Sequence, residues 1–293
     1  MRLALVSRDV FSAGPGGLGA YVTALADLLA GRAEVTIVTT AAHQSRYEEM
    51  RRASDPSLPD ERVRIEFVPE PSPDEAVRYA GHHHAWGARV FERLGDLYPG
   101  GGPDLIEVPD FLGEGAVVVQ ARRVRDRSLA NATVAVRAYT TSEMCDVLDG
   151  SLPDDIASIR LYTLERYSLR HADCLVWPGG DVLETYRRFY GSMPLATGVR
   201  IGHPLAPQPA ADPFVIPPAR EGGELRILYL GRLERRKGVQ TLLKALDGNP
   251  RQMAAHARRG RHQHGPTAPL DPRAARAHGS RRFANRLLRP RRP

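Results

Sequence analysis

Residues 3–38, LALVSRDVFSAGPGGLGAYVTALADLLAGRAEVTIV, decide the fold of this chain. Short apolar runs at both ends of the stretch, residues 3–6 and 35–38, predict buried strands. The segment between them carries an apolar stripe at helical spacing and ends at Gly31, a residue type that commonly terminates helices. The stripe consists of Leu18, Val22, Leu25, Leu28 and Leu29. This order of elements predicts the start of a βαβ unit.

A glycine-rich loop joins the first predicted strand to the predicted helix, and it contains Gly16, Gly17 and Gly19 around Leu18. Glycines at this place let a ligand approach the backbone amides of a helix N-terminus, which attracts anions. Such a loop can equally serve only to make a tight turn. The sequence leaves both interpretations open.

Strands and helices continue to alternate along the chain. The segments at residues 63–68, 104–108, 133–136 and 174–177 predict four more strands. Strands separated by helices form a doubly wound parallel sheet, so the predicted fold class is α/β. Six prolines within residues 203–218 predict a linker between two domains.

A second segment with the features of an anion site lies at residues 225–239, LRILYLGRLERRKGV. Its apolar start, residues 227–230, predicts a buried strand, and the helix that follows is predicted by Val239, Leu242, Leu243 and Leu246. Between strand and helix, glycines leave the backbone accessible, while Arg232 and Lys237 supply a guanidinium and an ammonium for phosphate oxygens. An ordinary basic loop is the alternative.

Four stretches together resemble the glycosyltransferases of family 4, which have the GT-B fold of two Rossmann-like domains facing each other across a cleft. The stretches are GGLGAYV at 16–22, PDLIEVPD at 103–110, LERYSLRHAD at 164–173 and GRLERRKG at 231–238. The resemblance implies transfer of a sugar from a nucleotide-sugar donor to an acceptor hydroxyl, with retention at the anomeric carbon. It also implies that no metal and no other cofactor takes part.

The same resemblance implies roles for individual residues. Arg232 and Lys237 would stabilise the negative charge that develops on the diphosphate leaving group, and so act as catalytic residues. The loop of Gly16, Gly17, Leu18 and Gly19 would place backbone amides near the donor phosphates or the acceptor.

The sequence departs from the family pattern at Tyr139. Many family members carry histidine where this chain reads VRAYTT at residues 136–141. Tyr139 either contacts the sugar or only packs. A tyrosine is a poor proton acceptor near neutral pH, so a histidine-like role does not carry over to it.

The composition changes abruptly after Pro250, because residues 251–293 contain 12 Arg and a single acidic residue, Asp271. We predict an N-terminal acceptor-side domain at 1–202, a linker at 203–223, the start of a truncated nucleotide-sugar-binding domain at 224–249 and a disordered Arg-rich tail at 250–293. No Glu follows Glu234, so the E-x7-E pair with which the family holds the donor is absent. We therefore expect impaired catalysis.

Three interpretations of the tail stay open. Out-of-frame translation of a GC-rich gene is favoured by the bias of 39 Arg over two Lys. A solvated extension without a role is the second. In the third, the protein is a non-catalytic stand-alone α/β domain whose basic tail binds nucleic acid or anionic lipid by screened charge.

The sequence contains no run of 18 apolar residues and no signal-peptide core, so we expect a cytoplasmic protein that could contact a membrane only peripherally. The run His82-His83-His84 predicts a solvated helix start rather than a metal site, because neighbours on a helix diverge. Residues 43–60 predict an exposed loop or irregular helix. Glu107, Asp110 and Glu114 cluster near the end of a predicted strand, where a carboxylate could contact acceptor hydroxyls; alternatively, Asp110 and Glu114 cap the next helix.

Overall fold

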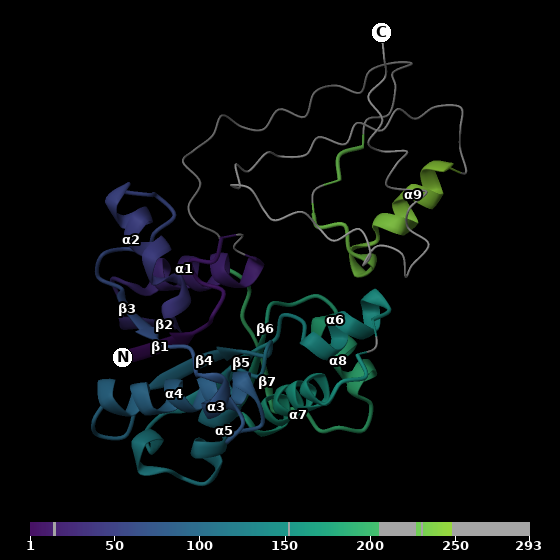
Figure 1. The fold of residues 1–293 in the computed structure, drawn as a ribbon. Coiled ribbons are helices and arrows are strands. Elements are labelled where there is room, and N and C mark those ends of the chain that lie inside the picture. Colours follow the sequence, from purple (N-terminus) through teal and green to yellow (C-terminus); the bar gives the residue numbers. More distant parts are fainter. Residues whose placement is uncertain (14–15, 152, 205–226, 230, 248–293) are drawn as a thin grey trace. The chain divides into compact units, whose positions relative to one another are not determined.

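The structure is a computed structural model, and it describes residues 1–13, 16–151, 153–204, 227–229 and 231–247 (Figure 1). The chain divides into two units, Met1–Pro213 and Phe214–Pro293. The predicted linker at 203–223, apart from its first two residues, and the predicted tail at 250–293 lie outside the described residues. The predictions for both segments stay predictions.

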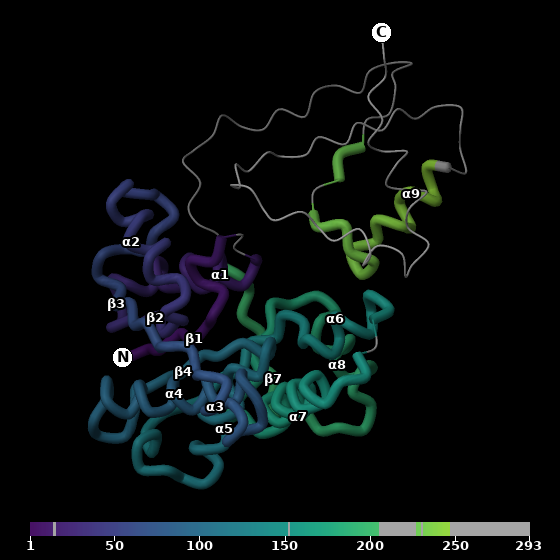
Figure 2. The backbone as a smooth tube through the Cα atoms, in the orientation of Figure 1, coloured from purple at the N-terminus to yellow at the C-terminus, as the bar shows by residue number. Residues whose placement is uncertain are grey.

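The first unit is built on a sheet of seven parallel strands in the order β3-β2-β1-β4-β5-β6-β7. The strands are β1 Arg2–Val6, β2 Glu34–Thr40, β3 Arg64–Val68, β4 Leu105–Pro109, β5 Thr133–Arg137, β6 Cys174–Trp177 and β7 Gly198–Arg200. β1 pairs with β4 although β2 and β3 come between them in the sequence (Figure 2). The predicted α/β class and all six predicted strands of this unit are confirmed.

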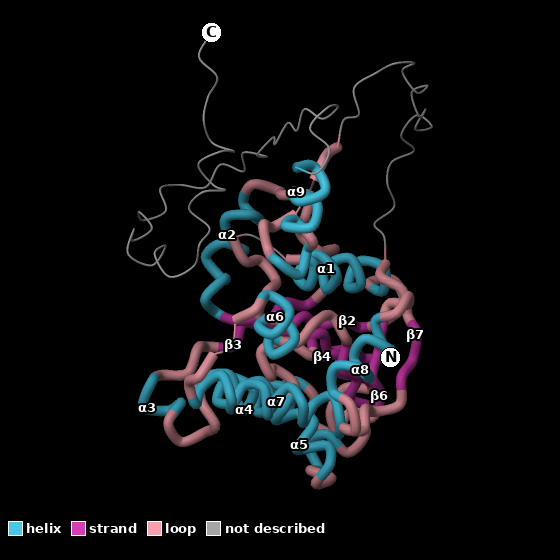
Figure 3. Tube along the Cα trace, turned by 90° about the vertical axis from the view of Figure 1, so that its right-hand side faces the viewer, coloured by secondary structure: helices cyan, strands magenta, loops and turns pink. Residues whose placement is uncertain are grey.

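Helices cover both faces of this sheet, with α1 and α2 on one side and α4, α5 and α7 on the other (Figures 1 and 3). This is the doubly wound arrangement that alternating strands and helices predict. The helical elements are α1 Gly17–Leu29, η1 Ala41–His43, α2 Gln44–Arg52, α3 Pro73–Ala76, α4 His82–Leu97, α5 Ala116–Arg123, η2 Arg127–Leu129, α6 Ser142–Asp149, α7 Ile156–His171 and α8 Val182–Tyr190.

Two hydrophobic clusters form the core, one on each face of the sheet. In β1, Leu3 and Leu5 point to the cluster that contains Val22 of α1, while Ala4 and Val6 point to the other cluster. The alternation follows from the two-residue period of a strand. Both faces of β1 are buried, which is why its sequence is continuously apolar.

Two local predictions for this unit differ from the structure. Leu28 is 53% exposed, and α1 packs on the sheet through Tyr21, Val22 and Ala26 instead of the full leucine stripe. Residues 44–52 form an exposed helix, α2, so that of the two alternatives the helix is found, but it is regular. Three of the leucines in the stripe, Leu18, Leu25 and Leu29, are only partly buried and pack against the margin of the cluster that contains Val22.

The described part of the second unit contains η3 Arg235–Lys237 and α9 Val239–Asp247. The predicted helix is therefore confirmed. The predicted strand is wrong for residues 227–229, which have no regular structure, and Leu228 is 66% exposed. A parallel strand needs neighbours on its edges and cover on both faces, which the described residues of this unit do not provide.

None of the helices within the described residues is both long enough and apolar enough to cross a bilayer.

Candidate functional site

The parallel strands of the first unit end at one edge of the sheet, which we call the carboxyl edge. The chain runs outward from β1 to β2 and β3 and then returns to β4 on the other side of β1. A reversal of this kind is a topological switch point, and open α/β sheets bind ligands outside the strand ends at such points. The candidate site therefore lies at the ends of β1 and β4.

The glycine-rich loop reaches this edge and is held there by Asp9. One carboxylate oxygen of Asp9 accepts hydrogen bonds from the backbone amides of Gly16, at 3.1 Å, and Gly19, at 3.0 Å. The other oxygen accepts from the Ser12 hydroxyl at 3.2 Å. The N-cap residue of α1 is Gly16, which has no side chain to cap the helix, so the Asp9 carboxylate caps it instead. An anion of the chain itself thus occupies part of the helix N-terminus.

The glycines of the loop differ in whether the surrounding atoms leave room for a side chain. A Cβ atom on Gly19 would lie 2.7 Å from the carbonyl oxygen of Asp9, so packing requires glycine there. A Cβ atom on Gly17 would meet nothing within 4 Å. Among the described residues, the amides of Gly17 and Leu18 have no hydrogen-bond acceptor. The open part of this N-terminus is therefore at Gly17 and Leu18.

A buried ion pair lies next to the loop, between the middle of β4 and the end of β5. The Arg137 guanidinium donates to both carboxylate oxygens of Glu107, at 2.8 and 3.2 Å, and to the carbonyl of Ile201 at 3.1 Å. Tyr21 of α1 donates to Glu107 at 2.8 Å and places its ring 4.3 Å from the guanidinium carbon. Sequence reasoning missed Arg137 and Tyr21. A sequence signal for the ion pair did exist, because Arg137 directly follows one predicted apolar strand and Glu107 lies in another predicted strand.

Tyr139 lies just beyond this pair and packs among aromatic rings. Its ring stacks on that of His203, with centroids 5.8 Å apart, and meets Tyr21 edge-on at 5.6 Å. The Tyr139 hydroxyl is buried and has no hydrogen-bond partner among the described residues. Burial raises the pKa of Tyr139 far above its usual value, so the phenol stays protonated.

Two further carboxyl groups at the edge are buried and occupied by protein donors. Asp110 accepts from the backbone amide of Tyr139 at 3.1 Å and from the Tyr186 hydroxyl, and burial raises the pKa of Asp110 to about 6. Glu114 accepts from the Arg8 amide at 3.2 Å, and burial raises the pKa of Glu114 to about 8. The capping interpretation is wrong for both, because the next helix, α5, has no side-chain cap.

A polar cluster surrounds Arg8 after β1. The Arg8 guanidinium donates to Glu70 at 2.6 Å and lies 3.1 Å from Nδ1 of His83 and 3.2 Å from Nε2 of His82. The predicted helix start at His82 is confirmed, but a solvated start is wrong for His83, where burial lowers the pKa to about 4. No group of His, Cys, Asp and Glu among the described residues has the arrangement of a metal site.

The stretch LERYSLRHAD, most of which lies on α7, contacts the loops at the carboxyl edge through Glu165. Its buried carboxylate accepts from the amides of Ser142 and Leu112, both at 2.9 Å, and from that of Glu143 at 3.3 Å. Burial raises the pKa of Glu165 to about 7. Glu165 therefore binds the N-terminus of α6 and fixes the loop after β4.

In the second unit, the basic segment, residues 231–238, is largely exposed. Arg232 and Arg236 each form an ion pair with Glu234, at 2.9 and 2.6 Å, while Lys237 has no ion pair among the described residues. Gly238 has a φ of 74° and ends η3 in the left-handed conformation that glycine adopts readily. The segment carries four basic residues and one acidic residue, which suits an anionic ligand.

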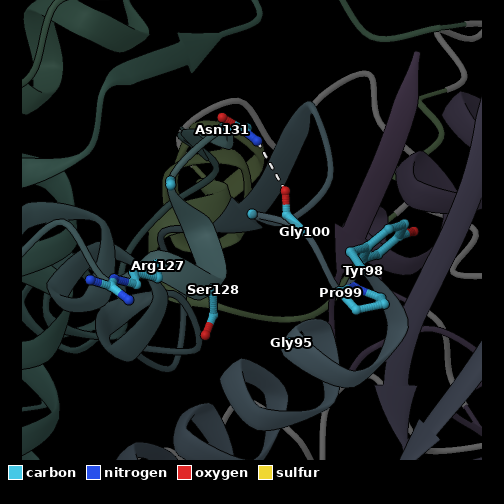
Figure 4. Close-up of a pocket in the computed structure, with 9 residues that line it drawn as sticks. Gly95, Tyr98, Pro99, Gly100, Arg127, Ser128 and Asn131 are labelled. Atoms are coloured by element: carbon cyan, nitrogen blue, oxygen red, sulfur yellow. Dashed lines mark hydrogen bonds between the residues drawn. The ribbon is translucent and has the colours of Figure 1, made fainter.

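A pocket of about 380 Å³ lies at the opposite edge of the sheet, before the starts of β4 and β5. Figure 4 shows Asn131 donating to the carbonyl of Gly100 in its wall, at 3.0 Å. None of the predicted site residues lines it. A small cavity of about 10 Å³ lies at the carboxyl edge, between Leu18, Tyr21, Glu107 and Tyr139.

Comparison with known proteins shows a match at the level of the family. Residues 16–199 match the glycosyl transferase 4-like domain. No curated protein matches. Among solved structures, the chain is similar to UGT2 of Phytolacca americana with UDP-2fluoro-glucose and pterostilbene, at 13% identity over 71% of this chain and 55% of that one, with a TM-score of 0.45.

Two other solved structures are similar at the same level. A UGT transferase from Siraitia grosvenorii in complex with UDP is 13% identical, covering 70% of this chain and 51% of that one, with a TM-score of 0.40. Anabaena Alr3699/HepE in complex with UDP is 15% identical, covering 69% of this chain and 44% of that one, with a TM-score of 0.37. The chain thus spans about half the length of these proteins. Because the family domain covers more than half of the sequence, the chain belongs to the glycosyl transferase 4-like family, as its motifs predict.

Proposed function

We propose that this protein transfers a sugar from a nucleotide-sugar donor to an acceptor hydroxyl, with retention at the anomeric carbon. The observation that carries the proposal is the family domain at residues 16–199, whose helix α1 presents the open amides of Gly17 and Leu18 at the switch point of the sheet. Helix N-termini at switch points bind phosphate groups. The acceptor would bind beside them, over the same edge.

Within that proposal, Gly17 and Leu18 would contact the donor phosphates or the acceptor, while Gly16 and Gly19 would position the loop. The reason is that the amides of Gly16 and Gly19 already donate to Asp9, and a phosphate would have to displace that carboxylate. Tyr139 would pack rather than contact the sugar, because the only polar atom of its side chain is buried.

Arg232 and Lys237 would stabilise the leaving group. As the bond between sugar and diphosphate breaks, negative charge grows on the diphosphate, and fixed cations lower the free energy of that charge. The Arg232 side chain is 74% exposed and pairs only with Glu234 among the described residues, so a phosphate can replace Glu234 without leaving a buried charge. Both side chains are therefore accessible to an anion.

For the 293-residue chain we propose slow catalysis. The family's glutamate pair has no counterpart after Glu234, so the sugar and ribose of the donor would lose contacts that hold them in position.

The test is a transfer assay with nucleotide sugars that carry a ¹³C-labelled sugar, offered singly to the 293-residue chain with simple alcohols as acceptors. We expect slow release of nucleoside diphosphate from at least one donor, with product of unchanged anomeric configuration by NMR. Inverted product would refute retention. If no nucleotide sugar binds at millimolar concentration, the proposed function is wrong.

A further inference from the structure

Three aromatic rings contact one another at the carboxyl edge, those of Tyr21, Tyr139 and His203. In the sequence, His203 is notable only as the first residue of the predicted linker. His203 stacks on Tyr139 and meets the ring of Tyr21 edge-on, with centroids 5.2 Å apart. The rings come from three separate parts of the first unit: Tyr21 from α1, Tyr139 from the end of β5 and His203 from the end of β7. His203 thus lies beside the helix that carries the glycine loop.

The backbone before His203 is fixed by two hydrogen bonds. The amide of Ile201 donates to Trp177 of β6 at 2.9 Å, which extends the pairing of β7 beyond its last residue. The carbonyl of Ile201 accepts from the buried guanidinium of Arg137 at 3.1 Å. The position of the His203 ring is therefore set by the sheet and by the ring of Tyr139, rather than by a free loop.

Of the three rings, only that of His203 offers polar atoms to a ligand. The hydroxyl of Tyr21 is used by Glu107, and that of Tyr139 is buried. His203 is exposed, and its ring nitrogens have no hydrogen-bond partner among the described residues. Arg137 and Glu107 satisfy each other.

The surroundings of His203 favour the neutral imidazole. Partial burial lowers the pKa of His203 below its usual value, and the nearby charge of Arg137 lowers it further, against a smaller opposite effect of Glu107. A neutral imidazole has one donor and one acceptor nitrogen. That combination matches a hydroxyl group, which can both donate and accept.

We propose that His203 binds a hydroxyl group of the transferred sugar and that Tyr139 positions the His203 ring for this contact. The inference rests on the proposed function and adds a specificity-determining residue to it. The ligand class is the sugar ring of a nucleotide sugar, not its diphosphate, because a neutral imidazole lacks the charge that would favour phosphate.

The test uses the full chain with ¹⁵N-labelled histidine, titrated with UDP-glucose, GDP-mannose, ADP-glucose and the matching nucleoside diphosphates. The His203 resonances are assigned by their loss in His203→Gln. We expect the nucleotide sugar that binds to shift them, and the diphosphate alone to leave them in place. His203→Ala should weaken the nucleotide sugar about 3- to 10-fold, as loss of one hydrogen bond predicts, and His203→Gln should weaken it less.

His171→Ala is the matched control, since His171 ends α7 just before β6 begins and therefore lies at the opposite edge of the sheet. This variant should bind as the original chain does. If a nucleotide sugar binds while His203 neither shifts nor affects affinity, the role of His203 is refuted and the proposed function stands. If no nucleotide sugar binds, both are refuted.

Discussion

The carboxyl edge of the first unit and the basic segment of the second both carry charges, but in opposite surroundings. Arg137 is 1% exposed and is paired with Glu107, whereas the Arg232 side chain is 74% exposed and Lys237 has no ion pair among the described residues. A buried charge needs a fixed partner, while an exposed one exchanges partners at little cost. The charges of the edge therefore hold the fold together, and those of the basic segment are available to a ligand.

The largest effect is expected from breaking the buried ion pair. Arg137→Met leaves the Glu107 carboxylate buried without its guanidinium. We expect the free energy of unfolding to fall by about 3–5 kcal/mol, measured by urea denaturation.

The control is the double variant Arg137→Met/Glu107→Gln, which removes both charges and keeps an acceptor for the Tyr21 hydroxyl. It should lose clearly less stability than the single variant, because no unpaired charge remains. A single variant as stable as the original chain would show that the pair does not support the fold.

Within the glycine loop, substitutions at Gly19 and Gly17 should differ in their effect on stability, and the difference should be smaller than the loss in the ion-pair variant. Gly19→Ala places a methyl group 2.7 Å from the Asp9 carbonyl, and we expect a loss of about 1–3 kcal/mol from overpacking. Gly17→Ala, two residues away, meets open space and should be neutral or stabilising by up to about 1 kcal/mol through its better helix propensity. Thermal unfolding measures both. Equal losses in the two variants would contradict the packing found around Gly19.

The stability of the first unit should depend on pH through Glu114. Its folded-state pKa, about 8, lies above the ordinary value of 4.5, so between these values the folded chain binds more protons than the unfolded chain. Stability from this group is present below pH 4.5 and is lost as the pH rises toward 8.

Glu114→Gln keeps an acceptor for the Arg8 amide and cannot titrate. Its stability should fall less steeply with rising pH than that of the original chain, by up to about 1.4 kcal/mol per pH unit. Urea denaturation at several pH values measures this slope. Identical slopes would mean that Glu114 is already ionised in the folded chain.

The smallest effect on stability is expected in the basic segment. Arg232→Gln and Lys237→Gln each change an exposed side chain, so the free energy of unfolding should change by less than about 0.5 kcal/mol. A loss of several kcal/mol in either variant would place these cations among the groups that hold the structure together.

The sequence predicts the elements that have strong local signals. The continuous apolar runs of β1 and β6 predict buried strands because a doubly covered parallel strand is apolar on both faces. β3 lies at the edge of the sheet, and its signal is instead the alternation of charged Arg64 and Glu66 with apolar residues. β7, Gly198–Arg200, escapes prediction because all three residues are exposed and form no apolar run. The strand expected at 227–230 fails for 227–229, since an apolar run forms a strand only where partners exist.

The site is predictable only in part. The glycine loop and the basic segment have local patterns, although nothing in the pattern reveals that Asp9 occupies two amides of the loop, seven and ten residues further along the chain. His203 has no local signal, because its place beside Tyr139 depends on how β5 and β7 lie in the sheet. Contacts set by tertiary packing are those that the sequence alone does not give.

The most direct measurement compares the affinity of the original chain and of Arg232→Gln/Lys237→Gln for the nucleotide sugar that binds, with unfolding of both chains recorded in parallel. Arg51→Gln/Arg52→Gln is the control, because it removes two exposed charges from α2, which buries no residue. We predict at least about tenfold weaker binding in the first variant, as loss of charge-assisted hydrogen bonds implies, with unchanged unfolding and unaltered binding in the control. Unchanged affinity after loss of both cations would contradict the account.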